Sequence, residues 1–385
     1  EISDKTCSTN LDMSRCLFSH GLPLLVFLCI GSATINAQVP VIDLSKLGKD
    51  IKISEEIDLA LQEYGMFIGT NVVQKSISDR AMSAANDLFS MESDKKDDIK
   101  VKDGGFMRGY IPYGQESGLL DKYFEPKEGF AYGYSFDTAA DLPFANALEG
   151  ENVWPAETHF TGKQTLQLMF DMSTRISTNI VNSISASFKH HTNEDLGLVL
   201  DGGDRISIMR LFHYFAKSNK EVIGDRDVAT LIGSSPHTDW GLLTVITQQE
   251  QIGGLQALYK DKWVDVPSHI PDSVVVNGGD FLSLLSKGRY KSPVHRVQSP
   301  EHNDRISYVY FFYPNFHTSL DMSCSLREGE SDSGSSGQEY NTLVSKDAVS
   351  EDSGAGHKSH KEMVFGDYII NKWKGVFRPA VPPKG

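Results

Sequence analysis

Between residues 205 and 314 the chain is a series of short runs of β-branched and aromatic residues, separated by turns rich in Gly, Asp and Pro. Runs of this length and composition favour β-strands, and the turn residues mark where each strand ends. The clearest examples are residues 242–247 and 305–312. Many short strands with regular turns predict a jelly-roll core, a double-stranded β-helix, in this part of the chain.

The sequence before this core mixes strands and helices. Residues 39–43 and 66–72 indicate strands, and apolar residues spaced along one face indicate a helix between them, with Ser54 as its N-cap. A second helix is expected at 81–89. We therefore expect an N-terminal α/β region beside the barrel, in a fold that is mainly β with flanking helices.

A long helix is predicted just before the core, over residues 164–188. Met169, Met172, Ile176 and Ile180 recur at the helical period, and a stripe of this kind is typical of packing against a core. Residues 100–160, between the two helical regions, are rich in Gly, Pro and aromatic residues, and we expect them to form mostly loops.

Two histidines and one aspartate form the main candidate site. His237 and Asp239 are two positions apart at the start of one strand-like segment, and His295 opens another. Residues two apart on a strand point to the same face, so His237 and Asp239 can share one interior. Two imidazoles and one carboxylate can hold one face of an octahedral iron and leave the other face open, as non-haem Fe(II) oxygenases do. The pattern therefore predicts an Fe(II) site.

Arg305 and Ser307 follow His295 by ten and twelve residues and share one face of the strand 305–312. An unpaired arginine inside an aromatic, β-rich strand would be costly to bury, so Arg305 needs an anionic partner. A guanidinium presents a planar fork that suits a carboxylate. The sequence thus places a carboxylate-binding pair near the predicted metal.

These motifs resemble the Fe(II)- and 2-oxoglutarate-dependent dioxygenases of the isopenicillin N synthase-like family. The resemblance covers roughly residues 39–325 and a C-terminal stretch, with several phrases in the same order and spacing. They are His237–Thr244, Gly253–Gln256, Val276–Asp280, Gly288–Val297 and Arg305–Ser307 in the core; Val39–Leu44, Tyr64–Phe67 and Arg108–Tyr110 before it; and Phe365–Tyr368 with Asn371–Trp373 after it.

The resemblance implies how the site is used. It implies that 2-oxoglutarate and O2 take the open positions of the iron, and that Arg305, Ser307 and Tyr214 bind 2-oxoglutarate. It implies oxidation of a small organic molecule, by hydroxylation, desaturation or cyclisation, with release of succinate and CO2. Phe212 stands where many members carry Asn, which removes one expected polar contact.

Two alternatives remain open. Isopenicillin N synthase itself uses no 2-oxoglutarate, and its Arg and Ser hold the carboxylate of the substrate. A catalytically silent barrel could instead act as a binding module, although such proteins usually lose a metal ligand or the anchoring arginine, and His237, Asp239, His295 and Arg305 are all present here.

Composition limits the partners. The net charge is −14, and an acidic surface repels phosphate backbones, so we expect no nucleic-acid substrate. Three of the four cysteines precede residue 30, which leaves Cys324 alone in the folded part and argues against a disulfide-built protein. We expect a monomer that binds a small-molecule substrate.

The two ends of the sequence differ from the core. Residues 1–38 are an N-terminal extension or a signal-like targeting peptide, because a basic stretch after Met13 precedes a short apolar run and small residues. The run is too short for a comfortable membrane span. The destination is the secretory route or an organelle reached through it, and otherwise the cytoplasm. The remaining expected divisions are 39–160 as the N-terminal oxygenase region, 161–325 as the core with its long helix, 326–363 as a disordered acidic insertion, and 364–385 as a helical tail.

Overall fold

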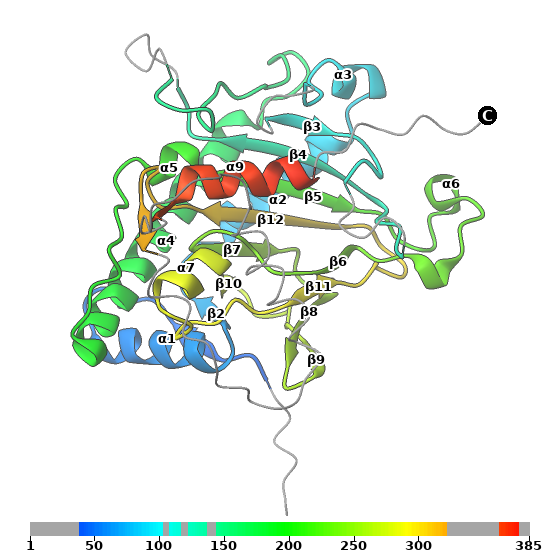
Figure 1. The fold of residues 1–385 in the computed structure, drawn as a ribbon. Coiled ribbons are helices and arrows are strands. Elements are labelled where there is room, and N and C mark those ends of the chain that lie inside the picture. Colours follow the sequence, from blue (N-terminus) through cyan, green and yellow to red (C-terminus); the bar gives the residue numbers. More distant parts are fainter. Residues whose placement is uncertain (1–37, 103–107, 117–121, 137–143, 322–361, 377–385) are drawn as a thin grey trace, which may run out of the picture. The chain divides into compact units, whose positions relative to one another are not determined.

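The computed structural model describes residues 38–102, 108–116, 122–136, 144–321 and 362–376 (Figure 1). The signal-like stretch and almost all of the predicted insertion 326–363 lie outside these residues.

Two sheets form the core, and the chain passes between them repeatedly. Of the eight strands from β5 to β12, four (β10, β7, β12, β5) lie side by side in the larger sheet, and the other four (β6, β11, β8, β9) form the smaller one. This exchange between two sheets is the expected jelly roll, and that prediction is confirmed. The strands are β5 (Ile208–Tyr214), β6 (Ser234–His237), β7 (Leu243–Gln248), β8 (Leu255–Tyr259), β9 (Lys262–Asp265), β10 (Ser273–Gly278), β11 (His295–Val297) and β12 (Arg305–Phe312).

The N-terminal region extends the larger sheet at both edges. On one edge β1 (Val41–Asp43) pairs in parallel with β2 (Met66–Thr70), and β2 pairs with β10. On the other edge β4 (Lys127–Gly133) pairs with β5, and β3 (Gly109–Ile111) pairs with β4. The segment 100–160, which was expected to be mostly loop, therefore supplies two strands that continue the barrel wall.

Helices cover the outer face of the larger sheet. The long helix α4 (Lys163–Thr192) packs against α1 (Ile51–Glu63), α2 (Lys75–Phe89) and β12, as predicted for a buttressing helix (Figure 1). The predicted N-cap of α1 is wrong. Asp50 caps this helix through a hydrogen bond from the Lys52 amide (3.1 Å), whereas Ser54 is buried within its first turns. A carboxylate at this position satisfies an amide that the helix leaves free.

Successive side chains of β12 point alternately to the two faces of the larger sheet. Ile306, Tyr308 and Tyr310 join the core on the helix side, where the Tyr310 hydroxyl lies 2.7 Å from the hydroxyl of Thr174 on α4. The alternate residues, among them Arg305 and Ser307, turn to the inside of the barrel. The predicted sharing of one interior face by these two residues is therefore correct.

The C-terminal segment packs beside the candidate metal site. Helix α9 (Phe365–Val376) carries Trp373, whose ring lies 5.0 Å from the ring of Trp240, the residue that follows Asp239. The predicted helical tail is thus present from Phe365. Among the described residues, no helix has the length and apolar character needed to cross a bilayer. The remaining elements are α3 (Ser93–Asp97), α5 (Gly203–Ile206), α6 (Lys220–Ile223), η2 (Val228–Thr230), α7 (Asp280–Leu285), β13 (Ser319–Asp321) and β14 (Glu362–Val364).

Candidate metal centre and its surroundings

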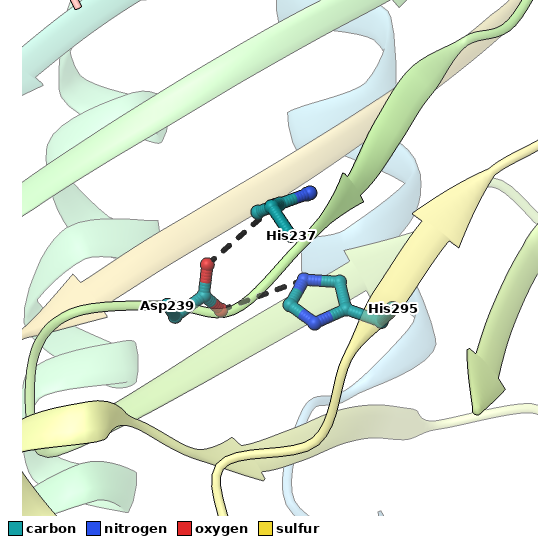
Figure 2. A group of neighbouring side chains, drawn as sticks. All are labelled: His237, Asp239 and His295. Atoms are coloured by element: carbon teal, nitrogen blue, oxygen red, sulfur yellow. Dashed lines mark ion pairs between the residues drawn. The ribbon is translucent and has the colours of Figure 1, made fainter. Parts of the chain in front are cut away.

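The structure brings the three predicted metal ligands together. His237 ends β6 and His295 begins β11, and the two residues face each other in the antiparallel pairing of these strands. Asp239 lies two residues beyond β6. Its two carboxylate oxygens are each 3.7 Å from one histidine Nε2, and all candidate ligand atoms lie within 4.8 Å of one another (Figure 2). These three side chains could therefore bind a single metal ion.

Backbone carbonyls orient both imidazoles. Nδ1 of His237 lies 2.7 Å from the carbonyl oxygen of Ser235, and Nδ1 of His295 lies 3.1 Å from that of Pro293. In each ring Nδ1–H donates this bond, which leaves the Nε2 lone pair directed at Asp239. Both histidines are therefore held in the tautomer that can ligate a metal through Nε2.

Asp239 is held as a carboxylate. Burial acts to raise its pKa, but His295, His237 and hydrogen bonds from Thr244 and Asn277 outweigh burial and keep the pKa below its usual value. The Asn277 amide donates to Oδ2 at 2.9 Å. An ionised aspartate with two imidazoles whose Nε2 atoms face it is a donor set that suits iron.

His237 is the more open of the two histidines, with 41% of its side chain exposed. Burial of the ring nitrogen and the nearby His295 imidazole lower its pKa, although Asp239 opposes them. The neutral form that a metal requires is therefore favoured.

Arg305 is buried in the interior with an incomplete set of partners. Only 1% of the residue is exposed, and Nη2 donates to Oε1 of Gln248 at 3.2 Å. Its Nε and Nη1 have no hydrogen-bond partner among the described residues. Burial lowers the pKa of Arg305, with Tyr214 opposing that effect. Two unsatisfied donors on a buried guanidinium fit the carboxylate of a bound molecule.

The other two predicted cofactor residues lie next to Arg305. Tyr214 pairs with Arg305 across the β5–β12 ladder, and Ser307 pairs with Phe212. The Ser307 hydroxyl is buried and has no partner within the described part of the chain, so it too is available to a ligand. His213, between Phe212 and Tyr214, faces the opposite way and bonds to Glu128 at 2.8 Å, as the alternation of a strand requires.

Two features of the interior were not predicted. Lys127 is fully enclosed and forms an ion pair with Glu125 (2.7 Å), and its ammonium lies 4.9 Å from the Phe212 ring. Glu125 lies two residues before Lys127, and this spacing was the available signal for the pair. Asn277 was noted only as part of a motif, and nothing in the sequence indicated that its amide meets Asp239.

Two family patterns match the chain. The 2OG-Fe(II) oxygenase superfamily matches residues 205–314, which hold the three candidate ligands and Arg305. The non-haem dioxygenase in morphine synthesis N-terminal domain matches residues 39–157. Together these matches cover the jelly roll and the region that extends its larger sheet.

Individual relatives agree with these matches. A probable iron/ascorbate oxidoreductase of Dictyostelium discoideum is 30% identical over 308 residues, covering 73% of this chain and 82% of the relative. A homoarginine-6-hydroxylase of Glycine max is 27% identical over 305 residues, which cover 75% of this chain and 89% of the relative. The crystal structure of a full-length Neurospora crassa protein in complex with alpha-KG and thymine has a TM-score of 0.64 and 24% identity, covering 88% of this chain and 97% of that one, and supports the fold.

Proposed function

The chain belongs to the 2OG-Fe(II) oxygenase superfamily, and on that premise we propose that His237, Asp239 and His295 hold its iron and that Arg305 holds the co-substrate. The enzyme is an Fe(II)- and 2-oxoglutarate-dependent dioxygenase that acts on a small organic molecule. Its reaction consumes O2 and 2-oxoglutarate and releases succinate and CO2. The oxidation is a hydroxylation in this proposal, and desaturation or ring closure are its variants.

The observation that supports this assignment best is that two buried Arg305 nitrogens, Nε and Nη1, lack a hydrogen-bond partner within the described part of the chain, on the side of the sheet that faces the inside of the barrel. A dicarboxylate can reach the metal with one end while its other carboxylate meets the guanidinium fork. The Ser307 hydroxyl can donate to the same carboxylate, and the ring of Tyr214 lies beside the Arg305 guanidinium.

The bound iron would supply the redox chemistry that couples the decarboxylation of 2-oxoglutarate to oxidation of a C–H bond. The protein holds the ligand side chains in place and orients the co-substrate. The carbonyls of Ser235 and Pro293 fix the imidazoles, and Asn277 fixes the carboxylate. Arg305 would orient the co-substrate.

Production of succinate from 2-oxoglutarate tests the assignment. The full chain is loaded with Fe(II) without oxygen, mixed with 2-oxoglutarate, and exposed to O2, and succinate and CO2 are measured. We expect succinate from the wild type and almost none from Asp239→Ala. The matched control is Asp79→Ala, which removes an exposed aspartate of α2 that pairs with Lys75 at the surface, and it should behave as the wild type does.

Two outcomes would favour the other candidates. Substrate oxidation at the same rate without 2-oxoglutarate would indicate an oxidase of the isopenicillin N synthase type, with Arg305 holding the substrate. A wild type that binds no Fe(II), together with an Asp239→Ala variant that changes nothing, would indicate a silent barrel.

The remaining expectations stay proposals. We propose that the enzyme acts as a monomer, which light scattering of the full chain tests. The stretch after Met13 is proposed to be a cleaved targeting signal, which N-terminal sequencing of protein from the native cell tests. The divisions at residues 38, 160, 325 and 363 are proposed as region boundaries, which limited proteolysis tests.

A further inference from the structure

Arg108 is a second buried arginine without a satisfied guanidinium. It is 7% exposed and precedes β3. Its Nε and Nη2 are buried and have no hydrogen-bond partner among the described residues. Native proteins rarely leave such donors unpaired, so this group points to a ligand that supplies acceptors.

The Arg108 guanidinium lies on the inner face of β4. A side chain at Gly133 would meet it, because a Cβ placed there would lie 2.4 Å from Nη2. The neighbouring Tyr132 packs on the helix side, against Trp154 and Phe170, so Gly133 faces the inside of the barrel. Glycine at this position leaves the space that the guanidinium occupies.

The register of the larger sheet places this guanidinium at the level of the metal ligands. Gly133 pairs with Ile208, Ile208 with Phe311, and Phe311 with Thr244. Thr244 is hydrogen-bonded to Asp239.

Arg305 lies at the other end of these strands. It pairs with Tyr214, which pairs with Lys127 at the start of β4, six residues before Gly133. At about 3.3 Å per residue the two arginines are separated by roughly 20 Å of strand. A 2-oxoglutarate that joins Arg305 to the metal therefore leaves Arg108 free for another molecule.

Two other buried cations of the larger sheet, unlike Arg305, already have carboxylate partners. Lys127 pairs with Glu125, and both Nη atoms of Arg210 meet Glu116, at 2.7 and 2.5 Å. Burial lowers the pKa of Arg108 to about 10, and Tyr313 opposes that change, so the group remains charged at neutral pH. A full positive charge with no counter-ion among the described residues would be stabilised most by an anion.

We propose that Arg108 binds a carboxylate of the oxidised substrate, so that the enzyme selects small carboxylic acids over their neutral counterparts. The proposal rests on the proposed function, because it assigns Arg108 to the molecule that the iron oxidises. The planar fork and the two free nitrogens suit a carboxylate, which can accept from both.

Binding of matched acid and amide pairs tests the proposal. The probes are acetate, hexanoate, cyclohexanecarboxylate and 3-phenylpropanoate, each with its primary amide, and binding to the full chain is measured by calorimetry without oxygen. We expect at least one acid to bind roughly tenfold or more tightly than its amide. Arg108→Met should abolish that preference, and Arg108→Lys should restore part of it by keeping the charge without the fork.

Arg80→Met is the control, because Arg80 is an exposed residue of α2 whose guanidinium donates to the carbonyl of Ser76 in its own helix. It should keep the wild-type preference. The proposal is overturned if no acid binds more tightly than its amide, or if Arg108→Met keeps the preference. Binding is scored with and without Fe(II) and 2-oxoglutarate, so a failure to bind 2-oxoglutarate counts against the proposed function alone.

Thermal stability gives a second readout that needs no substrate. Removing an unpaired buried charge should leave the melting temperature of Arg108→Met equal to that of the wild type or higher. A fall of several degrees would show that Arg108 is already paired with a carboxylate of its own chain, and would overturn the proposal.

Discussion

Arg305 and Tyr214 face each other directly across the β5–β12 ladder, with the guanidinium carbon 5.0 Å from the centre of the tyrosine ring. The ring covers one face of the guanidinium, and Gln248 takes one of its nitrogens. Its Nε and Nη1 have no hydrogen-bond partner among the described residues. In the proposed function these donors are kept for a ligand, at a cost to the folded state.

Replacing Arg305 separates its effect on the binding of 2-oxoglutarate from its effect on the stability of the folded protein. Arg305→Met should raise the KM for 2-oxoglutarate by a factor corresponding to about 2–5 kcal/mol, because a buried charge pair is lost. The same change should raise the stability of the ligand-free protein by roughly 1–4 kcal/mol, since an apolar residue replaces a buried charge. The KM is measured from initial rates of succinate formation, and the stability is measured by unfolding in denaturant. Arg80→Met should change neither, and a less stable Arg305→Met with normal KM would contradict the assignment.

We expect Asn277 to raise the affinity of the site for Fe(II) through its hydrogen bond to Asp239. Asn277→Ala removes the 2.9 Å bond to Oδ2 and leaves the three ligands in place. Loss of such an outer contact typically weakens metal affinity by roughly 10- to 100-fold. Anaerobic Fe(II) titration measures the change. Asn86→Ala, on the exposed side of α2, is the matched control, and equal affinities in the two variants would show that Asn277 has no such role.

The metal-free protein should lose stability as the pH falls below 6.5. The folded-state pKa of His237 is lowered from 6.5, chiefly by burial and by His295. The unfolded chain therefore binds a proton at this residue at a higher pH than the folded chain does, and stability falls between the two pKa values as the pH decreases. Melting temperatures from pH 7.5 to 5.5 measure this. His237→Gln should flatten the dependence, whereas His302→Gln, at an exposed loop, should not.

Trp373 should stabilise the end of the barrel that holds the metal. It is largely buried against Trp240, and the guanidinium of Arg210 lies 5.6 Å from its ring. Trp373→Ala should lower the free energy of unfolding by about 3–5 kcal/mol, as for other large aromatic truncations. Urea unfolding measures the loss. Trp263→Ala, on β9 at the other sheet, is the control, because its ring is only partly buried and lies against the Arg296 guanidinium. A larger loss in the control would contradict this role for α9.

The sequence was sufficient for the parts of the site that depend on local pattern. The strand 305–312 was predicted to the residue, because alternation and β-branched composition determine both its extent and its faces. The three candidate metal ligands, which the structure brings together, could be proposed because iron binding requires particular residue types at particular spacings. The long helix was predicted within a few residues of its ends.

The cap of α1 and the ion pair of Lys127 were missed, although each involves residues that are close together in the sequence. Asp50 rather than Ser54 caps α1, because the helix begins at Ile51, and Lys127 pairs with Glu125, two residues before it. The lack of a partner for Arg108 among the described residues could not be inferred, since it depends on which strands are neighbours. An arginine in a sequence carries no sign of whether its nitrogens will be satisfied.

The position of α9 has a consequence for how the enzyme is made. Every proposed ligand of the metal and of 2-oxoglutarate lies at or before Ser307, but Trp373, which packs on the residue after Asp239, is among the last described residues of the chain. During synthesis from the N-terminus, the proposed ligands leave the ribosome before α9, which supplies Trp373. We expect the proposed ligands to be able to bind iron before α9 is made. Cotranslational iron capture by chains stalled before residue 362 would test this order.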